Sequence, residues 1–183
     1  MFIDYVTLML INMTAALTIL AVFLWKYPVG EDRQTWAPVF AISGLVAVIC
    51  GFVMIFTWPL PKPYNSPFGE MSVLLGILFL AAAWSLAKGW NLLPLGIYAF
   101  FAGSAAVLIG IRIIDLSLTQ KPAMSGIGFI LTGLAGVMAG LILWLHRIKP
   151  FRILAAIILL IAAAIWAMTG YVAYWMHLVP PAK

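Results

Sequence analysis

The sequence predicts an all-α polytopic membrane protein: a single transmembrane domain over residues 1–183, with six helices in a compact bundle of three hairpins. Of its residues, 66% are hydrophobic and only 8% are charged, a balance typical of a chain whose main solvent is lipid. A bilayer core of roughly 30 Å needs about 20 apolar residues per helix. Six such runs occur, and we expect helices at residues 4–25, 36–58, 69–88, 92–116, 124–146 and 151–176.

Residues that break helices separate these runs, taken in order along the chain. The first boundary is Tyr27-Pro28-Val29-Gly30, the second is the proline-rich segment 59–67, and the third is Lys88-Gly89-Trp90-Asn91. The fourth and fifth are Lys121-Pro122 and Lys149-Pro150. Proline lacks a backbone donor and glycine ends helices readily, so all five connections are expected to be short.

The positive charges predict the orientation. One side of the membrane receives Lys26, Arg33, Lys88, Arg147, Lys149 and Arg152. The other side receives Lys62, Arg112, Lys121 and Lys183. Because cytoplasmic loops carry an excess of Lys and Arg, we expect the first side to be cytoplasmic. The chain is then a multi-pass protein of the cell membrane (inner or plasma membrane) with both termini extracytoplasmic.

Glycines recur at intervals of seven residues in three of the expected helices. The stripes are Gly44 and Gly51, then Gly96, Gly103 and Gly110, then Gly126, Gly133 and Gly140. Small residues let helix backbones approach closely where lipid gives no hydrophobic drive to pack. The stripes predict a compact bundle, and their partner helix can belong to the same chain or to another protomer.

Four ionisable residues are expected near the extracytoplasmic interface: Asp4, Glu70, Arg112 and Asp115. Such groups are costly at membrane depth and are candidates for function. One interpretation is a charged outer vestibule above a pore. The other is stabilisation, because Glu70 complements the positive end of its helix and Arg112 and Asp115 are spaced i,i+3 on one helix face.

Uncharged polar side chains gather on the first helix, where Asn12, Thr14 and Thr18 occur. With three aromatic residues, Trp84, Tyr98 and Trp166, they form our predicted solute path. An amide near mid-membrane needs a partner on another helix or in a pore. The alternative for Asn12 is therefore an interhelical hydrogen bond, and the alternative for Trp84 and Trp166 is packing.

The sequence lacks the residue sets that metal binding, cofactor binding and catalysis need. The single cysteine is Cys50, and the two histidines, His146 and His177, are expected on opposite sides of the membrane. Neither a haem nor a metal site is predicted from these residues. No phosphate-binding glycine loop or catalytic triad occurs, and the basic residues form no nucleic-acid-binding patch. We expect no enzyme activity, no cofactor and no nucleic-acid partner.

Three stretches carry a resemblance to known families. The segment from Thr57-Trp58-Pro59 through Phe68-Gly69-Glu70 resembles the signature of a prokaryotic membrane protein family known only as a domain of unknown function. The order of features more distantly resembles the AmiS/UreI family of amide transporters and urea channels. Tyr5 to Asn12 is similar to that family's first helix, and Gly89 to Tyr98 is similar to the start of its fourth.

The resemblance implies a ring of protomers, each a bundle of three helical hairpins with its own narrow path for a small neutral amide. The sequence also departs from those channels. Small apolar residues occupy 127–143, where the family carries tryptophans, and 153–166 has no acidic residue, where the family carries a glutamate. The second loop lacks the histidines of an acid gate.

Three functions from different classes are considered. The first is a membrane channel or facilitator for a small uncharged polar solute such as urea or an amide, selecting by diameter and hydrogen bonding. The alternative is a structural, non-catalytic subunit of a larger membrane complex, marked by a glycine stripe used on a foreign helix and by no continuous polar path. An intramembrane enzyme is the third and weakest. The expected partners are the bilayer and either a homo-oligomer or other membrane subunits.

Overall fold

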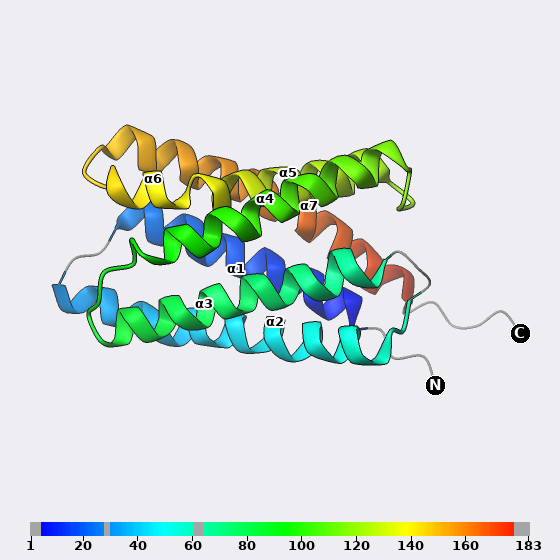
Figure 1. The fold of residues 1–183 in the computed structure, drawn as a ribbon, viewed down its shortest axis with the longest axis horizontal. Coiled ribbons are helices and arrows are strands. Elements are labelled where there is room, and N and C mark those ends of the chain that lie inside the picture. The colour runs from blue at the N-terminus through cyan, green and yellow to red at the C-terminus, as the bar shows by residue number, and fades with distance from the viewer. Residues whose placement is uncertain (1–4, 28–29, 61–63, 178–183) are drawn as a thin grey trace, which may run out of the picture.

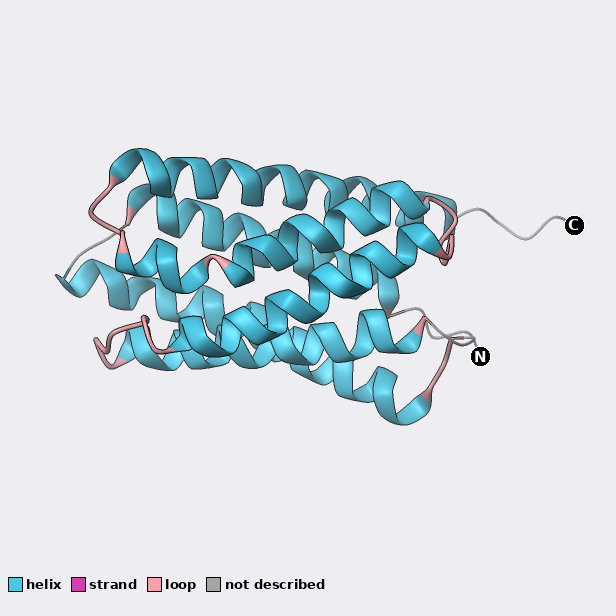
Figure 2. Ribbon diagram, turned by 45° about the horizontal axis from the view of Figure 1, so that its top comes forward, coloured by secondary structure: helices cyan, strands magenta, loops and turns pink. Residues whose placement is uncertain are grey.

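The computed structural model describes residues 5–27, 30–60 and 64–177, which form long helices aligned along one axis (Figure 1). The helices are α1 (Val6–Lys26), α2 (Ala37–Thr57), α3 (Met71–Ala87), α4 (Leu95–Asp115), α5 (Pro122–Val137), α6 (Ala139–Trp144) and α7 (Lys149–His177). A 3-10 helix, η1 (Gly30–Trp36), precedes α2, and a π-helical turn, η2 (Ser66–Glu70), precedes α3. Helices are drawn in cyan in Figure 2, with only short loops between them.

Five of the helical stretches are each long and apolar enough to cross a bilayer: those containing α1, α2, α3, α4 and α7. The fifth expected helix, 124–146, is divided in the structure at Met138 into α5 and the short α6. Gly136 and Gly140 flank this break, and glycine pairs are a common cause of helix kinks. The fold is thus an all-α membrane bundle, with one span made of two helices.

The helices pack as three close antiparallel pairs. Two pairs are hairpins of consecutive helices, α2 with α3 and α4 with α5, and the third joins the first helix, α1, to the last, α7. Val6 and His177 therefore lie at the same end of the bundle (Figure 1). We call this end, with residues 57–60, 64–70 and 115–122, the terminal end. The opposite end, with residues 26–27, 30–36, 88–94 and 145–152, is the basic end.

The glycine stripes face helices of the same chain. A Cβ atom on Gly44 of α2 would lie 2.8 Å from the carbonyl oxygen of Gly76 on α3, and a Cβ on Gly76 would lie 2.8 Å from that of Gly44. In the α4–α5 pair, a Cβ on Gly110 would lie 2.6 Å from the Gly126 carbonyl oxygen. Any side chain larger than hydrogen would push these backbones apart, so the stripes set the closeness of two of the three pairs.

Between its two ends, the outer surface of the bundle is mainly apolar. Large side chains such as Ile42, Phe56, Ile97 and Phe101 are exposed on it. Single exposed apolar residues are ordinary in soluble proteins, but continuous apolar coverage of this kind would not be stable in water. It matches the hydrocarbon region of a bilayer, as expected for a multi-pass membrane protein.

Candidate functional site

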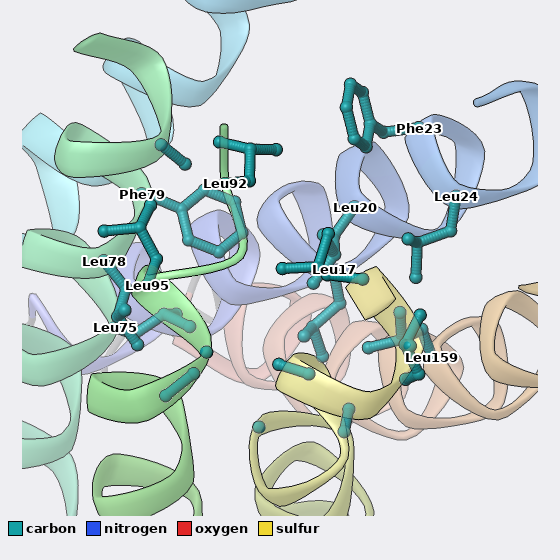
Figure 3. A pocket seen from close by; sticks show the side chains of 18 of the residues that line it. Leu17, Leu20, Phe23, Leu24, Leu75, Leu78, Phe79, Leu92, Leu95 and Leu159 are labelled. Carbon is teal, nitrogen blue, oxygen red and sulfur yellow. The ribbon is translucent and has the colours of Figure 1, made fainter. Parts of the chain in front are cut away.

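A cavity of about 140 Å³ lies inside the bundle, in the half nearer the basic end. All six spans contribute to its wall, and the cavity is half open rather than fully enclosed. Figure 3 shows Leu75, Leu78 and Phe79 of α3 on one side, with Leu17 and Leu24 of α1 and Leu159 of α7 on the other. A space lined by every span is in the position expected for a path along the axis of the bundle.

The wall of the cavity is almost entirely hydrocarbon. Thr132 of α5 is the single polar side chain among its lining residues, and none of them is charged. Moving an ion into such a space removes its hydration without supplying a counter-charge, which costs at least several kcal/mol per ion. The cavity can therefore admit small neutral molecules far more readily than ions.

Three aromatic side chains contact one another on the terminal side of the cavity; we call Phe68, Phe129 and Trp166 the aromatic plug. The ring of Phe129 meets Trp166 edge-on at 5.1 Å between centroids and lies 5.8 Å from the ring of Phe68. Trp166 is only 2% exposed. Seven residues separate it from Leu159 on α7, about 10 Å along a helix. Phe129 and Trp166 thus pack in the core on the terminal side of the cavity.

Hydrogen bonds fix the plug to the cavity wall. The indole Nε1 of Trp166 donates to Oγ1 of Thr132 at 3.1 Å, and that hydroxyl donates to the carbonyl oxygen of Gly128 at 2.8 Å. A Cβ on Gly128 would lie 3.1 Å from the indole ring, so the absence of a side chain there makes room for Trp166. Thr132 thus belongs both to the plug and to the cavity.

The polar residues predicted on the first helix all have partners inside the protein. The amide of Asn12 donates to the carbonyl oxygen of Ser43 on α2 at 2.9 Å, the interhelical bond that was the alternative interpretation. Thr14 and Thr18 donate to carbonyl oxygens of their own helix, those of Leu10 and Thr14. None of the three lines the cavity, and their part in solute passage stays a prediction.

The predicted aromatic residues lie in different places. Trp166 is in the plug, at the end of the cavity. Trp84 is 61% exposed on α3, where the ammonium group of Lys88 lies 5.6 Å from its ring, and Tyr98 is 43% exposed on α4. Neither of these two lines the cavity, so the structure places them on the outer surface of the single chain.

The predicted vestibule residues are at the terminal end, apart from Asp4, which lies outside the described residues. Glu70 is exposed where η2 joins α3. Arg112 and Asp115 form an i,i+3 ion pair at 2.6 Å, with both side chains more than half exposed. An exposed pair of this kind adds only about 0.3–0.5 kcal/mol of stability. The structure shows this pairing, and a vestibule stays a prediction.

Sequence reasoning missed most of the cavity wall, because leucines and phenylalanines in an apolar helix carry no signal that separates a cavity from lipid. The available signal in the sequence was the pair Gly128 and Thr132, which places a small residue and a hydroxyl one helical turn apart. The partner of that pair, Trp166, was among the predicted path residues.

Comparisons with known proteins agree with this architecture. Residues 1–179 match a family whose description is "Protein of unknown function (DUF981)". No significant match is found among curated proteins. Among solved structures, the chain is similar to the Helicobacter pylori urea channel in its closed state, at 18% sequence identity and a TM-score of 0.73. That match covers 94% of this chain and 99% of the channel, so the two share a fold over nearly their full lengths.

Proposed function

This chain belongs to the DUF981 family, and we propose that it is a passive channel for a small uncharged polar solute of the urea or amide type. The solute passes through the cavity of each single chain, between the aromatic plug and the basic end. The protein lies in the cell membrane with the basic end in the cytoplasm, and the apolar outer faces of several copies pack together as a homo-oligomer.

The observation that carries the proposal is the half-open cavity between the spans, with its uncharged wall. An axial space bounded by all six spans is what a channel needs, and an apolar wall with one hydroxyl excludes ions by the cost of dehydration. Narrow apolar stretches also gate by losing their water. The shared fold with a urea channel supports the same class of solute, although fold alone does not carry function.

The alternative, a structural subunit of a larger complex, is marked by a glycine stripe used on a foreign helix. Here the stripes are engaged within the chain, as Gly44 with Gly76 and Gly110 with Gly126 show. Its second mark, the lack of a continuous polar path, fits the almost entirely apolar wall of the cavity. Transport measurements separate the two functions.

Stopped-flow light scattering on liposomes containing the purified protein tests the channel. We expect urea and acetamide to cross faster than in empty vesicles, whereas potassium and chloride cross no faster, because the wall offers no charge to replace their hydration. Glycerol and water, measured in the same way, define the width of the path. Rates equal to those of empty vesicles for every neutral solute, with insertion confirmed, would favour the structural subunit.

A further inference from the structure

At the basic end, three side chains from separate elements stack against one another beside the cavity. The rings of Tyr27 and His146 lie parallel, with centroids 5.0 Å apart and an angle of 14° between them. The guanidinium carbon of Arg152 lies 4.8 Å from the centre of the Tyr27 ring. Tyr27 follows α1, His146 follows α6 and Arg152 is in the first turns of α7, so the stack joins three of the helices that enclose the cavity.

Each member of the stack contacts a residue of the cavity wall. The ring of Tyr27 lies 6.1 Å from that of Phe23, Nδ1 of His146 donates to the carbonyl oxygen of Leu143 at 2.8 Å, and Nη1 of Arg152 donates to that of Leu24 at 3.1 Å. Phe23, Leu143 and Leu24 all line the cavity. The stack therefore lies next to the wall of the cavity at the basic end, away from the aromatic plug.

One N–H donor of the Arg152 guanidinium, at Nε, is unpaired among the described residues. This Nε atom is buried and has no hydrogen-bond partner in the part of the chain that the structure describes. Arginine stays charged and carries five N–H donors in a fixed plane, and buried polar groups without partners are rare. The Nη1 donor is paired with the carbonyl oxygen of Leu24, which lies in the last turn of α1, where helix carbonyls lack partners within the helix. This bond does not account for Nε.

We propose that Tyr27, His146 and Arg152 form a gate at the basic end of the path, and that Nε of Arg152 donates a hydrogen bond to the carbonyl oxygen of the passing solute. This inference rests on the proposed channel function. A carbonyl group that enters a space without water loses its hydrogen bonds, and a buried donor restores one. The solute reaches Nε when the Tyr27 ring leaves its stacked position. This movement breaks the ring contacts of Tyr27, and the structure shows no side-chain hydrogen bond of Tyr27 that it would also break.

Urea and thiourea test the donor, because they share their N–H groups and differ in the acceptor atom; sulfur is the weaker acceptor. The variant is Arg152→Gln, whose amide keeps a donor for Leu24 but has no second nitrogen. In liposomes, we expect urea flux to fall about fivefold relative to thiourea flux, the effect of one lost hydrogen bond. Arg147→Gln is the matched control: it removes the same charge from an exposed position at the same end, and the ratio of the two fluxes stays unchanged.

Tyr27→Ala tests the gate. Removing the ring opens the basic end, so we expect both urea and thiourea fluxes to rise above those of the wild type. An unchanged or lower flux in Tyr27→Ala, with the protein still monodisperse in detergent, shows that Tyr27 is not part of a gate.

The outcomes are distinguishable from failure of the channel itself. If wild-type vesicles pass urea but Arg152→Gln lowers both fluxes by the same factor, Arg152 only caps α1 and the donor role is overturned. If the wild type passes neither solute faster than empty vesicles, the proposed channel fails, and the gate fails with it.

Discussion

Gly133→Ala is expected to lower the free energy of unfolding by about 1–3 kcal/mol, the usual cost of overpacking a close contact. A Cβ atom on Gly133 would lie 2.6 Å from the carbonyl oxygen of Gly103 and 2.7 Å from the backbone nitrogen of Val107. Because both atoms belong to the backbone of α4, no side-chain rotation relieves the contact, and the α4–α5 pair must separate. Thermal unfolding in detergent, followed by the loss of monodisperse protein, measures the effect.

Gly140→Ala is the matched control for this substitution. A Cβ on Gly140 would meet its nearest neighbour, the Cα of Gly96, at 3.8 Å, which is ordinary van der Waals contact. Since alanine is favoured over glycine in helices by up to about 1 kcal/mol, we expect Gly140→Ala to be neutral or slightly stabilising. Equal melting temperatures for the two variants would show that the glycine stripe does not set the spacing of α4 and α5.

Ala135→Trp is expected to reduce urea flux to the level of empty vesicles. Ala135 lines the cavity from α5, and a space of about 140 Å³ cannot hold an indole ring and a solute together. The same measurement on liposomes as for the wild type gives the flux, and gel filtration shows whether the variant remains folded.

The control for this block is Ala164→Trp, at an exposed position of α7, where an indole points away from the cavity. We expect its flux to match that of the wild type. Should Ala135→Trp fold and still pass urea at the wild-type rate, the solute does not travel through the cavity.

Much of the fold was predictable because bilayer thickness and backbone hydrogen bonding leave few alternatives to a bundle of long helices. The expected limits of the first helix, 4–25, compare with Val6–Lys26 in the structure, and those of the fourth, 92–116, with Leu95–Asp115. The break at Met138 was not predicted, because the hydrophobic pattern runs through it unchanged. The pairing of α1 with α7 also has no local signal in the sequence.

The candidate site was less predictable, for a physical reason. Polarity was our guide to a path, and the polar residues of α1 prove to bond within the protein, as Asn12 does with Ser43. The observed cavity is made by apolar side chains that resemble lipid-facing ones in composition. Its polar features come from pairs distant in sequence, such as Trp166 with Thr132 and Arg152 with Leu24, which only the three-dimensional arrangement brings together.

The central claim, that a neutral solute crosses the membrane through the cavity of one chain, is tested most directly by blocking that cavity reversibly. Ala82 lines it from α3, and Ala82→Cys in a Cys50→Ser background leaves one thiol, since Cys50 is the only native cysteine. We predict that methyl methanethiosulfonate slows urea flux to the level of empty vesicles and that reduction restores it. Unchanged flux after complete modification, confirmed by mass spectrometry, would contradict the claim.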